Sequence, residues 1–285
     1  MKYLNQSFLG AVAVSAAFVL SACSKEKTPD TAAQNGKDNA VQVEVVKAVA
    51  WDTKPYSSLL EYARDELKKQ NVQLEITYLT DSYTANQAVS DKQYDINYYQ
   101  HEAYLDSVRY KNNWDLHPIS YTFNTVFAGY SKKYKSVAEL PEGATVTIPA
   151  DPANNERALE LLHQNKLIQL KEHKLGDQIS QRDIIANPKN FKFVEVEQPM
   201  LPTAYNDSDL IVITGIYADR TGLVPNRDAL IKDQAAKKWA AVLVANSESK
   251  NNPAVIKVQN FFDSKAAYDF IQKNYGDFVI WDKQF

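Results

Sequence analysis

The sequence predicts an α/β protein built of two lobes, and three observations support this fold class. Apolar residues fall in clusters of two lengths, short runs that alternate as in strands and longer runs at helical spacing. These clusters follow one another as strand, helix, strand, an order that implies parallel sheets. The scheme restarts after Leu140-Pro-Glu-Gly143 with no low-complexity linker before it, which indicates two α/β lobes packed face to face.

The first half of the chain supplies the elements of the first lobe. Residues 41–46 and 74–79 are expected to be strands, and 56–69 is expected to be a helix because its apolar residues recur at helical spacing. Four residues carry that helical pattern: Leu59, Leu60, Ala63 and Leu67. The same reasoning then predicts, in order, a helix at 85–90, a strand at 94–98, a helix at 103–110 and a strand at 123–130.

The second half repeats the alternation and then returns to the first lobe. We expect a strand at 145–148, a helix at 155–165, strands at 191–196, 210–213 and 240–244, and helices at 253–263 and 265–273. The first lobe is accordingly assigned to residues 41–130 together with 230–285, and the second to 131–229. In open sheets ligands sit beyond the carboxyl ends of the strands, so a ligand cleft is expected between the lobes.

Residues 1–22 have the layout of an export signal peptide. One early cation, Lys2, precedes a run of Leu, Ala, Val and Phe. The apolar stretch 8–22 is shorter than the about 20 residues of a membrane span, so cleavage is favoured over a permanent transmembrane helix. Leu20-Ser-Ala-Cys23 resembles the lipobox of bacterial lipoproteins, which implies that Cys23 carries the lipid, palmitate included. The alternative is a free or buried thiol.

Residues 23–40 are expected to be a flexible tether behind the lipidated cysteine. The stretch is rich in polar and charged residues and has almost no apolar ones, so burial cannot offset the entropy of ordering it. The formal net charge of the chain is −3, and losing Lys2 with the signal peptide makes it −4. This weakly acidic balance gives no indication of nucleic-acid binding.

Four further segments carry a family resemblance: DINYYQHEAYLD at 95–106, AGYSKK at 128–133, LPEGATVTIPADPANNERAL at 140–159 and NPKNFKF at 187–193. They resemble the NlpA lipoprotein family, which includes methionine-type (MetQ-like) substrate-binding proteins of ABC importers. The resemblance runs from the lipobox through nearly the whole mature chain. It implies a two-lobed periplasmic-binding-protein fold, acting as a monomer, that closes on a small solute such as an amino acid. The protein would then dock on a permease that a cytoplasmic ATPase drives.

The resemblance also implies which residues bind the solute. Arg157 matches the family's carboxylate-binding arginine, and its planar guanidinium group suits a bidentate carboxylate contact. It lies in a helix that Asp151-Pro-Ala-Asn-Asn155 is expected to start, where Asn154 and the backbone N–H groups would add to anion binding. The alternative is a solvated arginine paired with Glu160.

Aromatic residues would form the rest of the pocket. Tyr99 and His101 match the family's pocket motif, and aromatic faces suit an apolar or thioether side chain. Core packing of Tyr99 and a surface position of His101 are the alternatives. Tyr83 and Asn86 match a family segment that faces the cleft. Phe127 is either a pocket wall or a buried strand residue.

The sequence departs from the family pattern at the amino-acid head group. Thr214, included among the expected ligand-binding residues, and Ala241 stand where methionine-binding members carry asparagines. Burying a zwitterion without its partners costs about 1–3 kcal/mol per unmet group. Another amino acid, a short peptide or a methionine derivative therefore fits better than free methionine. Glu156, next to Arg157, replaces a small residue, and an arginine common after Pro202 is missing.

An enzyme is the competing class, and the residue pattern argues against it. The four histidines have no metal-ligand spacing: His101, His117, His163 and His173. The only cysteine is assigned to the lipid, and no phosphate-binding loop occurs among the 8 glycines. No cofactor or metal is therefore expected. A surface or adhesin-type lipoprotein without a transport role stays open as an alternative.

The membrane that holds the lipid is left undecided between inner and outer. Ser24 follows Cys23, an arrangement that resembles enteric lipoproteins of the outer membrane. Docking on an importer instead requires access to the inner membrane. Both alternatives place the folded part in the cell envelope, facing the periplasm.

Overall fold

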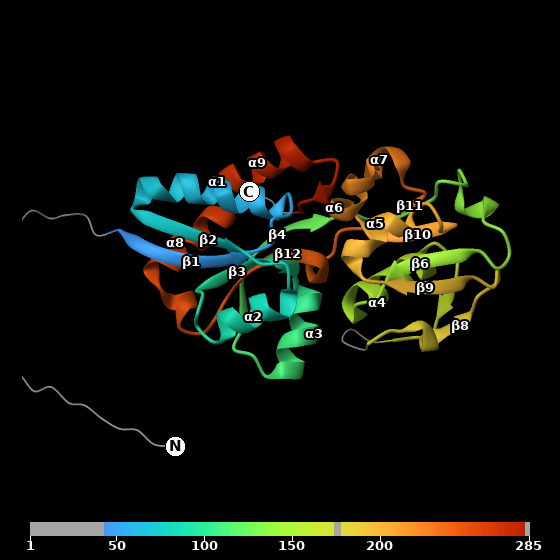
Figure 1. Ribbon diagram of the computed structural model, residues 1–285, viewed down its shortest axis with the longest axis horizontal. Coiled ribbons are helices and arrows are strands. Elements are labelled where there is room, and N and C mark those ends of the chain that lie inside the picture. Colours follow the sequence, from blue (N-terminus) through green and yellow to red (C-terminus); the bar gives the residue numbers. More distant parts are fainter. Residues whose placement is uncertain (1–42, 174–177, 283–285) are drawn as a thin grey trace, which may run out of the picture. The chain divides into compact units, whose positions relative to one another are not determined.

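The computed structural model describes residues 43–173 and 178–282, which form two large β-sheets with helices on both faces of each (Figure 1). A third, two-stranded sheet pairs β7 with β8. The prediction of an α/β protein with two lobes is thereby confirmed. The predicted signal peptide, Cys23 and the tether lie outside the described residues. Within the described ranges, no helix is long and apolar enough to cross a membrane.

The first sheet has six strands in the order β13-β4-β12-β3-β1-β2. Their bounds are β1 Glu44–Ala50, β2 Val72–Tyr78, β3 Ile96–His101, β4 His117–Thr125, β12 Ala240–Ala245 and β13 Val279–Ile280. Strand β1 is parallel to both neighbours, β2 and β3, whereas β12 is antiparallel to β3 and β4. The three parallel strands therefore end at one edge of the sheet, where β1 and β3 deliver Trp51 and His101.

Helices cover the two faces of the first sheet because its strand residues alternate between two apolar clusters. Val46, Ala48 and Ala50 pack under helices α1, α8 and α9, whereas Val49 packs under α2 and α3 (Figure 1). The helix bounds are α1 Tyr56–Leu67, α2 Ser82–Ser90, α3 Glu102–Asn112, α8 Pro253–Phe262 and α9 Lys265–Tyr275.

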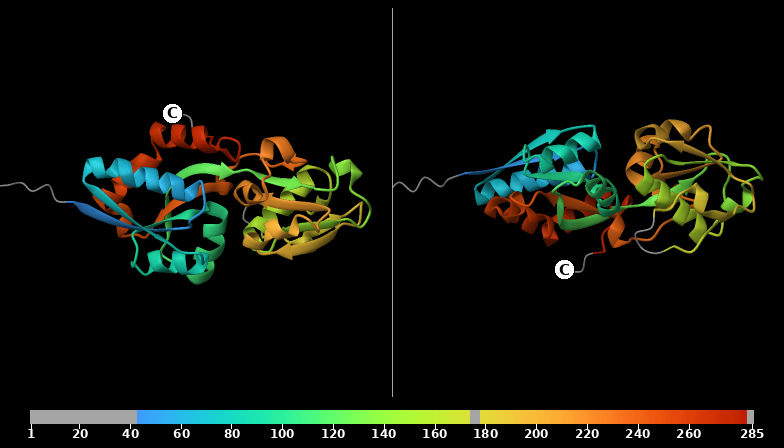
Figure 2. Two further views of the ribbon diagram at one scale, coloured as in Figure 1. Left: turned by 45° about the horizontal axis from the view of Figure 1, so that its top comes forward. Right: turned by 90° about the horizontal axis from the view of Figure 1, so that it is seen from below.

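The second sheet has five strands in the order β11-β5-β10-β6-β9. Their bounds are β5 Phe127–Tyr130, β6 Thr145–Pro149, β9 Lys192–Val196, β10 Leu210–Thr214 and β11 Ile231–Lys232. Helix α4, Pro152–Gln164, covers one face, and the short helices α5, Leu201–Ala204, and α6, Gly215–Ala218, cover the other (Figure 2). The remaining elements are α7 Pro225–Asp228, β7 Gln169–Leu170 and β8 Ile184–Ala186. Single 3-10 turns are η1 Lys68–Gln70, η2 Val137–Glu139, η3 Gln181–Asp183, η4 Gln198–Met200, η5 Asp219–Thr221, η6 Lys237–Trp239 and η7 Ser249–Asn251.

The chain passes from one sheet to the other at residues that differ from the expected lobe boundaries. The strand predicted at 123–130 is two strands, β4 in the first sheet and β5 in the second, and the chain changes sheet at Val126. Strand β11 also belongs to the second sheet, although residues from 230 onward were expected in the first lobe. Asn124 and Thr125 are the only polar residues in the predicted strand 123–130, and periodicity over so short a stretch carries no sign of the change of partner.

Helix α4 begins three residues before its expected start at Asn155. Asp151 is the N-cap, since its side chain accepts a hydrogen bond from the backbone N–H of Asn154 at 3.0 Å, and Pro152 occupies the first turn. The Asp151 cap and Pro152 therefore start the helix earlier than its apolar spacing predicts, although polar residues follow them. Asn154 and Arg157 consequently lie on the same helix.

Candidate functional site

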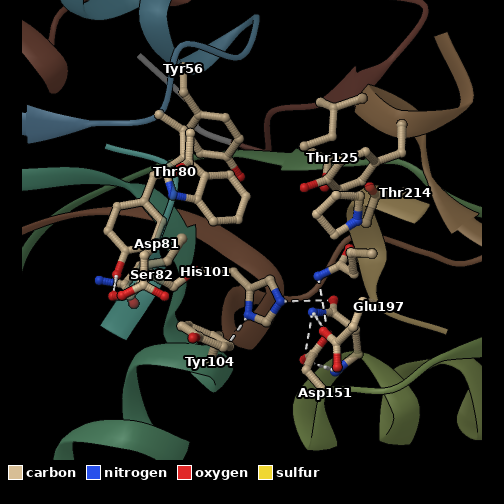
Figure 3. Close-up of a pocket in the computed structure, with 18 of the residues that line it drawn as sticks. Tyr56, Thr80, Asp81, Ser82, His101, Tyr104, Thr125, Asp151, Glu197 and Thr214 are labelled. Atoms are coloured by element: carbon tan, nitrogen blue, oxygen red, sulfur yellow. Dashed lines mark hydrogen bonds between the residues drawn. The ribbon is translucent and has the colours of Figure 1, made fainter. Parts of the chain in front are cut away.

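A cavity of about 310 Å³ lies where the strands of both sheets end (Figure 3). Residues at the carboxyl ends of β1, β2 and β3 form one wall, and residues after β6, β9 and β10 form the other. This is the position at which open α/β sheets bind ligands. Aromatic side chains supply much of the lining: Trp51, Tyr56, Tyr83, Tyr99, Tyr104 and Tyr217.

His101 connects the two walls of this cleft. It caps helix α3, because Nδ1 accepts a hydrogen bond from the backbone N–H of Tyr104 at 3.0 Å. The ring proton therefore resides on Nε2, which donates to Oδ1 of Asn154 on α4 at 3.0 Å (Figure 3). Burial, followed by the positive charge of Arg157, lowers the pKa of His101 to about 3, so the imidazole is neutral at physiological pH.

Tyr99 and Trp51 form an apolar platform on the first wall. Their rings stack with centroids 5.2 Å apart, and the Tyr99 hydroxyl donates to the backbone oxygen of Ser82 at 2.7 Å. Tyr83 also lines the cleft, but it is half exposed and packs edge-on against Trp114, so it lies at the rim. Five of the seven predicted ligand-binding residues thus line the cavity: Tyr83, Tyr99, His101, Asn154 and Thr214.

Arg157 does not line the cavity. Its side chain is 1% exposed, and its carboxylate partner is Asp233, with Nε and Nη2 both bonded to Oδ2 at 2.7 and 2.6 Å. Nη2 also donates to the backbone oxygen of Thr125, and the guanidinium group lies over the rings of Phe127 and Trp239. Arg157 therefore joins α4 to both segments through which the chain passes between the sheets. Sequence reasoning missed Asp233, which lies 76 positions away.

Asn86 is also buried behind the cleft rather than in its lining. It forms a closed amide cluster with Asn97 and Gln100, and all four hydrogen bonds measure 2.6 to 3.0 Å. Gln100 reaches the cavity, whereas Asn86 and Asn97 are fully buried. Asn86 accordingly fixes the position of a lining residue.

Replacing Asn86 with leucine is expected to lower the free energy of unfolding by about 2–4 kcal/mol. The change leaves the side-chain N–H group of Asn97 and the side-chain oxygen of Gln100 without their partner in the core, at about 1–3 kcal/mol for each unmet group. Urea unfolding measures the effect. The same substitution at exposed Asn274 is the control and should change stability by no more than about 0.5 kcal/mol. An equal loss in both variants contradicts the assignment.

The two positions that depart from the family pattern differ in their surroundings. Thr214 lines the cleft at the end of β10, is 5% exposed, and its hydroxyl group has no hydrogen-bond partner among the described residues. Ala241 lies in the core of the first sheet, paired in register with His101 on β3. The cavity therefore has an unused hydroxyl group where an amide was expected.

Several lining residues were not singled out from the sequence. Three of them lie just after strands: Trp51 directly follows β1, Glu197 directly follows β9, and Asp81 lies three residues beyond β2. The rule that ligands bind at the carboxyl ends of strands would have indicated all three. No group of three His, Cys, Asp or Glu side chains that could hold a metal occurs in residues 43–173 and 178–282.

Two α/β lobes with a cleft at the strand ends define the class of two-lobed substrate-binding proteins. The chain belongs to the NlpA lipoprotein family, whose profile matches residues 48–281, which confirms the resemblance in the sequence. This family consists of substrate-binding proteins rather than enzymes, and its members are envelope-associated lipoproteins.

Several known proteins are similar to this chain over most of its length. The probable D-methionine-binding lipoprotein MetQ of Vibrio cholerae is 31% identical over 94% of this chain and 92% of its own length. Outer membrane lipoprotein 3 of Mannheimia haemolytica is 32% identical over 91% of this chain and 92% of its own length. Among solved structures, a nutrient-binding protein from Burkholderia cenocepacia bound to methionine has a TM-score of 0.78 at 27% identity, covering 84% of this chain and 100% of that one.

Proposed function

We propose that this chain captures a small amino-acid-like solute in the cleft and delivers it to the permease of an ABC importer, which a cytoplasmic ATPase drives. Lipid on Cys23 would hold the folded part to a membrane facing the periplasm, and the chain would act as a monomer. The observation that carries the proposal is the cavity of about 310 Å³ at the strand ends of both sheets. Similarity to MetQ lipoproteins and to ABC-transporter binding proteins supports the same role.

The size and lining of the cavity favour a small solute. Ligand pockets span about 300–1,000 Å³, and this one falls at the small end of that range. The Trp51–Tyr99 platform suits an apolar or thioether side chain. Thr214 and Ala241 supply no amide for an amino-acid head group, so we propose another amino acid, a methionine derivative or a short peptide rather than free methionine.

We propose that Arg157 acts from behind the cleft. Its guanidinium group already has a carboxylate in Asp233, and only Nη1 has no hydrogen-bond partner among the described residues. In this position Arg157 keeps His101 neutral through its positive charge and holds α4, which carries Asn154, against the first lobe. The predicted contact between Arg157 and a ligand carboxylate could involve only Nη1, and it stays a prediction.

Mass spectrometry of solute released from purified residues 41–285, which form one compact unit, is expected to identify a bound amino-acid-like compound. Calorimetry with that compound should then show roughly tenfold weaker binding for Trp51→Leu, because an aromatic contact contributes about 0.5–1.5 kcal/mol beyond its area. Phe270→Leu, which removes a stacked aromatic ring on α9 outside the cavity lining, is the control and should bind as the parent does. A protein that holds no solute and binds none contradicts the proposal and leaves the surface-lipoprotein alternative.

A further inference from the structure

We propose that the cleft selects solutes with a net positive charge, recognised through an ammonium group, over zwitterions and anions. The inference rests on the proposed function, because it names the chemical class of the solute that the same cleft would bind. Three observations carry it: the charges in the lining, the internal neutralisation of Arg157, and a buried hydroxyl group without a partner.

The lining contains three carboxylates and, within the described ranges, no lysine or arginine. Asp81 follows β2 on the first wall, and Asp151 and Glu197 follow β6 and β9 on the second (Figure 3). Asp151 accepts hydrogen bonds only from neutral groups, the backbone and side-chain amides of Asn154 at 2.9 to 3.1 Å and the side chain of Gln198 at 3.1 Å. Burial raises the pKa of Asp151, and among the described residues no cation is paired with its carboxylate.

The three carboxylates and Tyr104 line the same cavity, with Asp81 on one wall and Asp151 and Glu197 on the other (Figure 3). Burial raises the pKa of the Tyr104 hydroxyl group, a hydrogen bond with Ser82 lowers it, and the negative charges of Asp151, Asp81 and Glu197 raise it further. An ammonium group beside Tyr104 would be attracted by each of them, whereas a ligand carboxylate there would be repelled.

The cations nearest to the cleft are already engaged. Arg157 does not line the cavity, and the carboxylate of Asp233 offsets its charge. Lys238 pairs with Glu156 and Glu160 on α4. Arg220 stacks on the outer side of the lining residue Tyr217 but is itself exposed, where solvent screens its charge. The carboxylates in the lining are thus the dominant charge that a solute meets.

The remaining walls suit an ammonium group as well. Aromatic faces attract cations within about 6 Å of the ring centre, and the stacked rings of Trp51 and Tyr99 line the cavity. Thr214 is 5% exposed and its hydroxyl group has no partner among the described residues, so its oxygen is free to accept a hydrogen bond. A buried polar group without a partner in a cavity wall points to a bond supplied by the solute.

Calorimetry of the purified protein at about pH 6, where amino groups are protonated, tests the selection with probes that share one side chain. The probes are methioninamide, a cation; methionine, a zwitterion; and N-acetylmethionine, an anion; the three phenylalanine counterparts form a second series. We expect the amides to bind roughly tenfold more tightly than the amino acids, as a charge-assisted bond would give, and the acetylated compounds not to bind.

Two isosteric variants locate the effect. Glu197→Gln and Asp151→Asn are each expected to reduce the ratio of amide to amino-acid affinity several-fold, and asparagine preserves the helix cap. Glu142→Gln removes the same charge in the loop before β6, at the opposite end of that strand from Asp151, and should leave the ratio unchanged. Thermal unfolding of each variant confirms that it is folded.

The outcomes separate this inference from the proposed function. Amino acids or acetylated compounds that bind as tightly as the amides overturn the cation preference while leaving a working binding protein. A co-purified solute that is anionic or zwitterionic does the same. No binding of any of the six probes overturns the cation preference too, and the absence of any co-purified solute would then remove the proposed function with it.

Discussion

Replacing Arg157 with alanine is expected to lower the free energy of unfolding by about 3–5 kcal/mol, the cost of removing one partner of a buried ion pair. The guanidinium group is 1% exposed and is bonded to Asp233 and to the backbone oxygen of Thr125. Its removal leaves the buried Asp233 carboxylate with a single backbone donor, the N–H of Phe127, and no opposite charge. It also frees α4 from both crossing segments, so solute binding should weaken together with stability.

Urea unfolding of a double-mutant cycle measures the coupling energy between Arg157 and Asp233 apart from their other interactions. Arg157→Ala combined with Asp233→Ala should recover part of the loss, because no uncompensated charge then remains in the core. Arg227→Ala, which removes an exposed arginine from its pair with Asp228, is the control and should change stability by less than about 1 kcal/mol. Equal effects at Arg157 and Arg227 would show that the buried pair has no special structural role.

Lowering the pH from about 6.5 towards 3 is expected to destabilise the parent protein more steeply than a His101→Asn variant. The pKa of His101 is about 3 in the folded chain, against about 6.5 when unfolded. In this window the unfolded state binds a proton that the folded state rejects. The stability contributed by neutral His101 is therefore complete above about pH 6.5 and is lost as the pH falls towards 3, by up to about 1.4 kcal/mol per pH unit.

Chemical unfolding at several pH values gives the two slopes. Asparagine at position 101 still caps helix α3 but cannot titrate, so its curve should be flatter in the acid range. Buried carboxylates whose pKa is raised, such as Asp151 and Asp233, act in the opposite direction, but both proteins contain them and their effect cancels in the difference. Identical slopes would mean that His101 accepts a proton in the folded state, and the hydrogen bond that Nδ1 accepts from the Tyr104 N–H would have to be abandoned.

Local sequence patterns determined most of the elements. The helix at α1 and the strands at β2, β6 and β10 follow directly from their apolar spacing, and each begins within a few residues of its predicted start. Cleft residues at helix starts could also be predicted, such as His101 at the N-cap of α3 and Asn154 in the first turn of α4. Strand ends and helix starts lie where ligands bind in α/β folds. The family resemblance was readable for the same reason, since its motifs are continuous in the chain.

Only the tertiary structure decided which residues distant in sequence come together. It placed β5 and β11 in the second sheet, gave Arg157 the carboxylate of Asp233, and put Asn86 into an amide cluster behind the wall. Each of these depends on pairing between segments that periodicity treats as independent. A guanidinium group binds a carboxylate from a solute or from its own chain with the same chemistry, and the choice between them is fixed by which group the fold brings within hydrogen-bonding distance.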